Sequence, residues 1–271
     1  MNSRMSSLMR KARKFAAICL VAAKAKTVYW REFVARALFF AIILFIFSRL
    51  WGALVGPSGA LAGFSGRDLV WYLTVAEVMM LSATSLLRQV ESDVKSGQIA
   101  YLLVRPVNYA LYQASYYLGE SAVNLAVNAA VGGTIATVLA GPPPATLSSA
   151  VQAIVLLLLA VATQFSFVMI IGLLAFFVEE CRPFYWIYSK LVFTLGGMFL
   201  PLDIYPHAIR LLAEALPFKS VTYGPARVFV AGSPGLFANL ALTGAAWVVA
   251  LAFVLAWEYR EGETRVNANG G

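Results

Sequence analysis

The fold is decided by the stretch TLSSAVQAIVLLLLAVATQFSFVMIIGLLAFFV, residues 146–178, which contains no charged side chain. A helix needs about 20 predominantly apolar residues to cross the hydrocarbon core of a bilayer, whereas a barrel strand needs only about 10. The stretch is far longer than a strand, and a segment in lipid must satisfy its own backbone hydrogen bonds. It therefore predicts a membrane-spanning helix that is tilted or projects beyond the bilayer.

Similar apolar segments lie on both sides of this stretch, separated by charged or Pro/Gly-rich breaks. The composition agrees, since 61% of the 271 residues are hydrophobic and 13% are charged, against about 25% charged in a soluble domain. We predict an all-α integral membrane protein with one transmembrane domain over residues 1–271, whose six-helix bundle occupies 33–258. The six expected spans lie near residues 33–55, 69–88, 109–140, 146–178, 184–203 and 236–258.

Lys and Arg are distributed unevenly between the two sides of this topology. With the N-terminus inside, 16 of the 21 fall on the cytoplasmic side and five, at positions 49, 67, 210, 219 and 227, on the external side. Cytoplasmic loops of membrane proteins carry such an excess. Both termini, including a tail over 259–271, are therefore expected in the cytoplasm. The net charge of +8 needs no nucleic-acid partner to explain it.

Residues 1–32 mix basic with apolar side chains, as in Lys14, Phe15, Ile18 and Lys24. One interpretation is an amphipathic helix that lies among the headgroups of the inner leaflet, with membrane lipids as its partners. The other is a basic tail that only sets the topology. The composition of the segment leaves both open.

The expected cytoplasmic loop after the second span alternates charged with apolar side chains. It reads RQVESDVKSGQIAYLLVRP over residues 88–106. A short amphipathic helix broken at Gly97 would present one face to the membrane and the other to a cytoplasmic partner. The alternative interpretation is an ordinary solvated connector.

The expected external segment before the last span is rich in proline and reads GGMFLPLDIYPHAIRLLAEALPF over residues 196–218. Residues 207–216 are too few to cross a bilayer, which predicts a re-entrant or interfacial helix. The functional interpretation is an external gate, and the alternative is a surface helix that caps the bundle. The gate residues would be Pro201, Asp203, Pro206, Glu214 and Pro217.

Five polar side chains fall inside the expected spans: Glu77, Glu120, Asn124, Asn128 and Gln164. A charge at that depth is costly unless it faces a cavity or a partner, so Glu77 is a candidate for the transport pathway. Glu120 lies nearer the inner interface. The two asparagines also suit a structural role, in which amides join helices at close approach.

Motifs for catalysis and metal binding are missing. The chain has no G-x-x-x-x-G-K-[ST], no G-x-G-x-x-G and no H-E-x-x-H. Two isolated cysteines, Cys19 and Cys181, and the single His207 predict no metal site. We therefore expect no catalytic residue, metal or cofactor in this chain, and any active transport would take its energy from a partner subunit or an ion gradient.

Three runs together resemble permease subunits of the type-2 ATP-binding-cassette (ABC) exporters, in the branch of small, separate bacterial permeases. They are KSGQIA…LVRP within 95–106, GGMFLPLD…LPF within 196–218, and YGPARV over 223–228. The resemblance covers residues 15–260 through loose patterns. It implies six spans, an N-terminal interfacial helix, a cytoplasmic coupling helix after the second span and an external re-entrant hairpin before the sixth.

The resemblance also implies partners. Two permeases, identical or related, would pair in the bacterial cytoplasmic membrane, and two copies of a separate ATPase that binds ATP and Mg would dock beneath them. The cargo would be exported, and in that family it ranges over drugs, lipids and glycans. The coupling role would fall to Glu91, Ser92, Asp93, Lys95, Ser96, Gly97 and Gln98, with contacts added by Glu179, Glu180 and Arg182.

Two other classes of function stay open. A secondary transporter driven by an ion gradient would use Glu77 or Glu120 as its proton site, although the chain lacks an inverted repeat of broken helices. A membrane-embedded enzyme or a scaffold is the other class. An enzyme would gather His, Asp or Glu at one interface, and a single histidine argues against it.

Overall fold

The computed structural model describes residues 2–28, 30–55, 59–104 and 107–269. Within these ranges the chain is almost entirely helical and forms no strand, only an isolated bridge between Leu61 and Phe64. The all-α prediction is confirmed. The elements are α1 (Asn2–Thr27), α2 (Trp30–Val55), α3 (Gly66–Leu81), α4 (Leu86–Lys95), α5 (Gln98–Leu103), α6 (Tyr109–Ala140), α7 (Leu147–Leu173), η2 (Leu174–Phe176), α8 (Arg182–Leu195), η3 (Leu202–Ile204), α9 (His207–Ala215), η4 (Pro217–Ser220), α10 (Tyr223–Ala231) and α11 (Pro234–Asn269).

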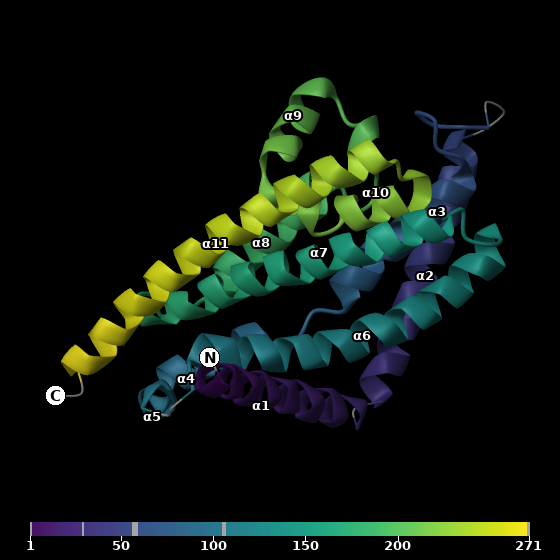
Figure 1. Cartoon of the computed structure of the whole chain (residues 1–271). Helices are drawn as coiled ribbons and strands as arrows, with labels where there is room; N and C mark the ends of the chain where they lie inside the picture. The colour runs from purple at the N-terminus through teal and green to yellow at the C-terminus, as the bar shows by residue number, and fades with distance from the viewer. Residues whose placement is uncertain (1, 29, 56–58, 105–106, 270–271) are drawn as a thin grey trace.

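The helices form an elongated bundle with α7 as its central member (Figure 1). Helices α11, α10 and α4 all pack against α7, while α1 packs along α6 and α2 contacts both α3 and α6. Short elements gather at two places. Helices α4 and α5 lie at one end of the bundle, here named the α4 end, and α9 projects at the opposite side, here named the α9 end (Figure 1).

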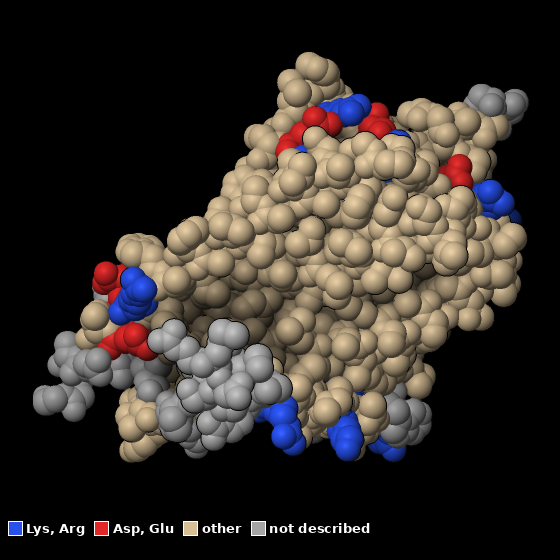
Figure 2. Space-filling view, viewed as in Figure 1, with Lys and Arg blue, Asp and Glu red and all other residues tan. Residues whose placement is uncertain are grey.

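Five helices are long and apolar enough to cross a membrane. They cover Arg31–Val55, Gly66–Lys95, Tyr109–Ala140, Leu147–Phe176 and Pro234–Thr264, and they correspond to five of the six predicted spans. The second of them combines α3 with α4, which are separated by a break at residues 82–85. On the face in Figure 2 the charged side chains lie toward the edges of the molecule, and a broad middle region is free of them. These features are those of a multi-pass membrane protein.

The predicted span over residues 184–203 is not a single helix. Helix α8 ends at Leu195 after 14 residues, so it is about 21 Å long, shorter than the roughly 30 Å hydrocarbon core. The chain then turns at Gly196 and Gly197, and Gly197 has φ +67°, a conformation that favours glycine. The described residues thus contain five segments long enough to cross a membrane and the shorter α8, so the prediction of six full spans is not confirmed.

After α9 the chain returns to the end of α8. The Thr222 hydroxyl and the Tyr223 amide donate to the Gly196 carbonyl at 2.7 and 3.1 Å. A Cβ on Gly196 would lie 2.8 Å from Thr222 Oγ1, so only glycine permits this approach. Residues 217–230 are mostly buried, whereas α9 is mostly exposed. The segment that folds back into the bundle is therefore η4 with α10, residues 217–231, and we name it the returning segment. Residues 207–216 stay on the surface.

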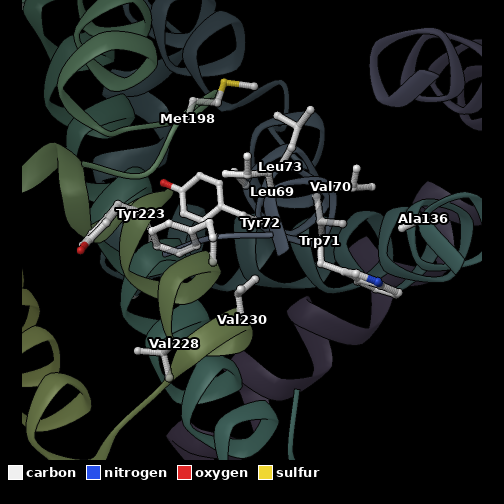
Figure 3. Packing of buried hydrophobic residues seen from close by; sticks show 14 of the residues in the cluster. Leu69, Val70, Trp71, Tyr72, Leu73, Ala136, Met198, Tyr223, Val228 and Val230 are labelled. Carbon is white, nitrogen blue, oxygen red and sulfur yellow. The ribbon is translucent and has the colours of Figure 1, made fainter. Parts of the chain in front are cut away.

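The buried apolar side chains form two clusters. The cluster nearer the α9 end contains Leu69, Val70, Tyr72 and Leu73 of α3, which meet side chains of the returning segment (Figure 3). The cluster nearer the α4 end is built on α4, α7 and α8. Figure 3 also labels Met198 and, on α10, Tyr223, Val228 and Val230, which belong to the same cluster, and the ring of Tyr223 lies 6.5 Å from that of Tyr72 of α3.

The two ends of the chain are helical. In α1, Cys19 and Ala22 pack directly on Gly119 of α6, where a Cβ would clash with both. The side chains of Arg13, Lys14 and Lys24 are exposed, and those of residues 1–11 lie outside the described side chains. The place of α1 in the headgroup layer stays a prediction. Residues 259–269 of the expected tail continue α11.

Candidate functional site

Helix α4 has one apolar face that is fully covered. Leu86, Leu87 and Val90 are buried against α7 and η2. The fit is close at Gly172, where an added Cβ would lie 2.9 Å from the Val90 Cβ. The amphipathic pattern predicted a short helix here, and the packing explains its orientation, because the apolar stripe can be buried only against α7.

Two acidic side chains of α4 are held within the protein. Glu91 is 8% exposed and accepts a 2.7 Å hydrogen bond from Lys95. Asp93 accepts a 2.7 Å hydrogen bond from the Tyr109 hydroxyl, which in turn accepts one of 2.9 Å from Gln113. The Asp93 bond joins α4 to α6, whereas the Glu91–Lys95 pair lies within α4 itself. The sequence did not single out Tyr109 or Gln113, since nothing in their spacing points to α4.

The opposite face of α4 and the turn after it are exposed. Ser92, Lys95 and Ser96 lie on this face, and Gly97 ends the helix with φ +72°. Gln98 is exposed at the start of α5, where Ile99 turns inward and is buried. The last residues of the predicted loop motif, Arg105 and Pro106, lie outside the described residues.

A groove of about 550 Å³ brings the two predicted inner loops together. Its lining comes from α4 and from the segment before α8: Arg88, Glu91, Ser92, Lys95, Ser96, Glu180 and Arg182. Glu179 is exposed beside it. The groove carries charges of both signs, so it suits a protein surface with its own charged side chains. We name it the α4 groove.

Cys181 lies in the second inner loop, between Glu180 and Arg182, and is fully buried. Burial, with a smaller contribution from Glu91, raises the pKa of the Cys181 thiol to about 11. The thiol is therefore protonated near neutral pH and packs as a small apolar group. It makes no metal site, and no group of three or more metal-binding side chains occurs in the described part of the chain.

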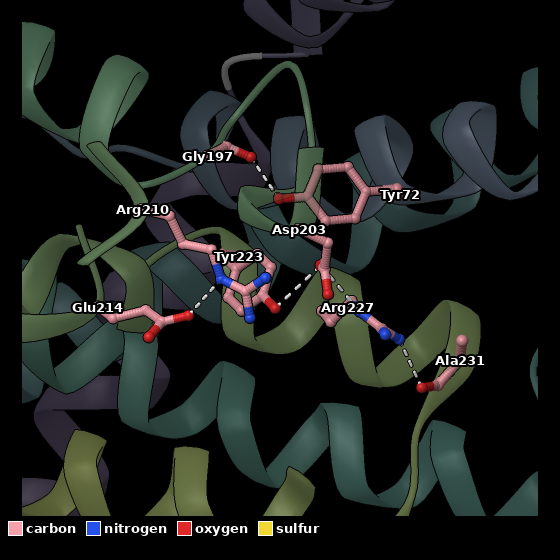
Figure 4. Close-up of polar contacts among 8 residues, drawn as sticks. All are labelled: Tyr72, Gly197, Asp203, Arg210, Glu214, Tyr223, Arg227 and Ala231. Atoms are coloured by element: carbon pink, nitrogen blue, oxygen red, sulfur yellow. Dashed lines mark hydrogen bonds and ion pairs between the residues drawn. The ribbon is translucent and has the colours of Figure 1, made fainter. Parts of the chain in front are cut away.

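A polar cluster joins the returning segment to the turn after α8 (Figure 4). Asp203 accepts hydrogen bonds from Tyr223 at 3.0 Å and from Arg227 at 3.1 Å. The Arg227 guanidinium also lies 4.9 Å from the ring centre of Phe64. Tyr72 of α3 donates to the Gly197 carbonyl. Sequence reasoning proposed Asp203 but missed its partners, although Tyr223 and Arg227 stand in the motif YGPARV.

The other predicted gate residues differ in how deeply they are buried. Pro201 and Pro217 are buried, and Pro206 is exposed at the start of α9. Glu214 pairs with Arg210 one turn earlier on α9 at 2.7 Å, with both side chains about 40% exposed. The hydrogen bond to Glu214 raises the pKa of Arg210. Of these five predicted gate residues, Asp203 is the one with described side-chain hydrogen bonds to the returning segment.

The polar side chains predicted inside the spans are all buried. Asn124 and Asn128 of α6 donate to the carbonyl and hydroxyl of Ser82, at 3.3 and 3.0 Å. They join α6 to the end of α3, which agrees with the structural interpretation. Glu77 and Gln164 each have a side-chain oxygen without a hydrogen-bond partner among the described residues. Glu120 lies on α6, one turn before Asn124.

Comparison with known proteins identifies the family of this chain. A search of curated proteins found no match. A family profile described as "ABC-2 family transporter protein" matches residues 28–270, nearly the whole chain. The matched region includes α4, its groove and the returning segment. By this match the chain belongs to the ABC-2 family of transporter proteins.

Proposed function

We propose that this chain is the permease subunit of an ABC exporter and that a separate ATPase docks in the α4 groove. The observation that supports the proposal most directly is the convergence of α4 with Glu180 and Arg182 in one groove. The chain itself has no phosphate-binding loop. ATP and Mg would be bound by the partner, and the permease would supply only the surface on which the partner acts.

The attachment of α4 supports a coupling role. Its exposed face offers Ser92, Lys95, Ser96, Gly97 and Gln98 to a partner. Its other face is fixed to α7 by Val90 and to α6 by the hydrogen bond between Asp93 and Tyr109. A displacement of α4 would therefore be transmitted to two long helices through direct contacts. In this scheme Asp93 transmits force to α6, whereas Glu91 belongs to the lining of the docking groove.

The assembly we propose contains two permeases, identical or related, and two ATPase copies, with both termini of this chain in the cytoplasm of a bacterial cell. ATP binding would close the ATPases, push the two α4 helices and shift the spans as rigid bodies. The ATPase must bind one conformation more tightly than the other, because equal affinity would shift nothing. Export of a drug-like, lipid or glycan cargo would follow, with the cluster around Asp203 as the external gate.

The test is a bulky substitution in the groove. Ser92→Trp places an indole among the groove residues without changing the charge or the buried face of α4. After gentle purification from the native membrane, we expect the wild-type chain to bring an ATPase with vanadate-sensitive turnover. We expect Ser92→Trp to recover at least about tenfold less of it, as for an interface residue worth about 1.4 kcal/mol or more.

The matched control is Ser148→Trp, because Ser148 is equally an exposed serine on a helix but lies far from the groove, in the first turn of α7. It should bring down the same amount of ATPase as the wild type. Equal recovery with Ser92→Trp would overturn the docking site. A chain that purifies alone under conditions that preserve complexes would overturn the exporter itself.

A second candidate function rests on Glu77. This carboxyl is 2% exposed within α3, and its Oε1 has no hydrogen-bond partner among the described residues. A buried carboxyl of this kind is typical of proton-coupled carriers. A secondary transporter would lose transport on addition of an uncoupler and on Glu77→Gln or Glu120→Gln substitution, yet it would continue after ATP depletion. The exporter predicts the opposite response to both treatments.

A further inference from the structure

A second hollow lies beside the α4 groove, between α4, α6, α7 and α8. It has a volume of about 350 Å³. Its walls combine cationic, aromatic and amide side chains, which include Arg88, Tyr117, Gln164, Arg182, Tyr185 and Trp186. We name it the α8 cleft. Its lining is mainly apolar in area but polar at defined points, which is the usual make-up of a small-molecule site.

The two arginines give the α8 cleft an anionic preference. Arg88 lies in α4 and Arg182 is the first residue of α8; both are exposed, and neither forms an ion pair with any described side chain. The nearby carboxylate of Glu91 is already bound to Lys95. Guanidinium groups bind phosphate and carboxylate through paired, charge-assisted hydrogen bonds. Two of them on one cleft therefore select a ligand with an anionic group.

Gln164 also lines the cleft and has an unused acceptor. Its side chain is 3% exposed, and its Oε1 makes no hydrogen bond with the described residues. Buried polar atoms almost always have a partner, and an orphan points to a missing donor. A ligand whose anionic group binds the two arginines and that also carries a hydroxyl or amine could supply that donor.

The wall formed by α8 faces away from the bundle. Phe184, Trp186 and Ile187 are 43%, 63% and 51% exposed, which in a membrane protein is a surface for lipid chains. Trp186 belongs both to this surface and to the lining of the cleft. A ligand could therefore keep an apolar chain along α8 while its head reaches the arginines. These features together describe an amphiphile that enters from the bilayer.

We propose that the α8 cleft binds an anionic phospholipid, with its phosphate between Arg88 and Arg182 and a headgroup hydroxyl near Gln164. If the proposed function is correct, this lipid, or a cargo of the same chemistry, is the transported molecule, and only this part of the inference rests on the proposed function. The binding step itself needs no ATPase. It can therefore be tested on the full chain alone.

Trp186 provides the reporter. The full-length chain is placed in lipid nanodiscs that contain brominated phosphatidylglycerol or, at equal mole fraction, brominated phosphatidylcholine. Bromine quenches a nearby indole, and subtraction of the Trp186→Phe signal isolates this tryptophan from the other five. We expect stronger quenching by the glycerol lipid. Glycerol 3-phosphate, added to the aqueous phase, distinguishes a lipid site from a site for soluble phosphate, because it would saturate only a soluble-anion site.

The decisive variant is Arg88→Gln with Arg182→Gln. It should lower the apparent affinity for the anionic lipid by about tenfold or more, as expected for lost charge-assisted hydrogen bonds. The matched control removes two exposed arginines outside the cleft, Arg13→Gln with Arg260→Gln, and should retain the preference. Equal quenching by the two lipids in the wild type, or equal loss in the control, would overturn the site.

A second variant tests shape without changing charge. Ser189 also lines the cleft, and Ser189→Leu, which adds no indole to the reporter signal, should exclude the lipid while leaving ATPase recovery unchanged. Ser92→Trp in the α4 groove should do the reverse, with loss of ATPase and retention of the lipid preference, measured by subtracting the signal of Ser92→Trp with Trp186→Phe. Failure of the lipid site and failure of ATPase docking are thus separate results. Thermal melting of each purified variant verifies that the chain is folded.

Discussion

The Tyr109 hydroxyl donates a 2.7 Å hydrogen bond to Asp93, and this contact joins the first turn of α6 to α4. Gln113, one turn further along α6, donates to the same hydroxyl. The oxygen of Tyr109 is therefore both donor and acceptor, and its ring is buried. Helix α4 cannot rotate away from α6 without breaking this chain of hydrogen bonds.

Tyr109→Phe removes the hydroxyl and leaves Asp93 and Gln113 without their shared partner. We expect the free energy of unfolding to fall by about 1–2 kcal/mol, seen as a lower midpoint of thermal unfolding in detergent. ATPase recovery should be retained while the stimulation of ATP hydrolysis falls, because the outward face of α4 is unchanged. Tyr112→Phe on the same helix is the control, and equal effects of the two would contradict a specific role for Tyr109.

The Glu91–Lys95 pair can be tested by charge reversal. Glu91→Lys places two lysines one helical turn apart, and the new lysine stands at the buried position 91. The substitution should therefore destabilise the protein by about 1–3 kcal/mol. The exchange Glu91→Lys with Lys95→Glu restores opposite charges. A double-mutant cycle should then give a favourable coupling of about 0.5 kcal/mol, since Lys95 is 44% exposed. A coupling energy of zero would mean that the ion pair contributes nothing.

The Asp203–Arg227 pair should stabilise the returning segment more than its exposed counterpart on α9. The side chains of Asp203 and Arg227 are only 21% and 18% exposed, against about 40% for Glu214 and Arg210. Arg227→Met leaves a half-buried carboxylate without its cation and should cost about 1–3 kcal/mol, whereas Arg210→Met should cost less than about 1 kcal/mol. Thermal unfolding of both variants checks the order, and the reverse order would be inconsistent with this geometry.

Two glycine substitutions should have opposite signs. Gly196→Ala directs a methyl group at Thr222 Oγ1 and at the Val192 carbonyl, and should destabilise the turn by about 1–3 kcal/mol. Gly133→Ala, inside α6, meets no atom within 4 Å and should stabilise the helix by up to about 1 kcal/mol. Denaturation midpoints in the same detergent compare them. A neutral Gly196→Ala would show that the returning segment packs less closely than described.

Hydropathy was sufficient to locate five helices, because a segment in hydrocarbon has no choice but to be apolar and helical. It overestimated the span at 184–203, since Leu202 and Met198 are apolar for a different reason: they are buried against the returning segment. The turn at Gly197 depends on that packing and on no local signal beyond the glycine itself. Hydropathy alone does not separate a lipid-facing residue from a buried one.

The candidate site was predictable in position but not in detail. Alternation of charged and apolar residues located α4, and the two loops were both predicted to face a partner. The pattern could not show that Asp93 is bound within the protein, because only the fold brings its partner Tyr109 near. Arg227 was missed for the same reason, since its partner Asp203 lies across the turn.

Arg88 and Arg182 line both the α4 groove and the α8 cleft. A lipid phosphate and an acidic surface of the ATPase would therefore compete for, or share, the same two guanidinium groups. Any change that the lipid makes in the affinity for the ATPase must be matched by an equal change that the ATPase makes in the affinity for the lipid. Because the two arginines belong to both sites, the affinity of the ATPase would depend on whether a lipid occupies the cleft, and no signal would have to cross the bilayer.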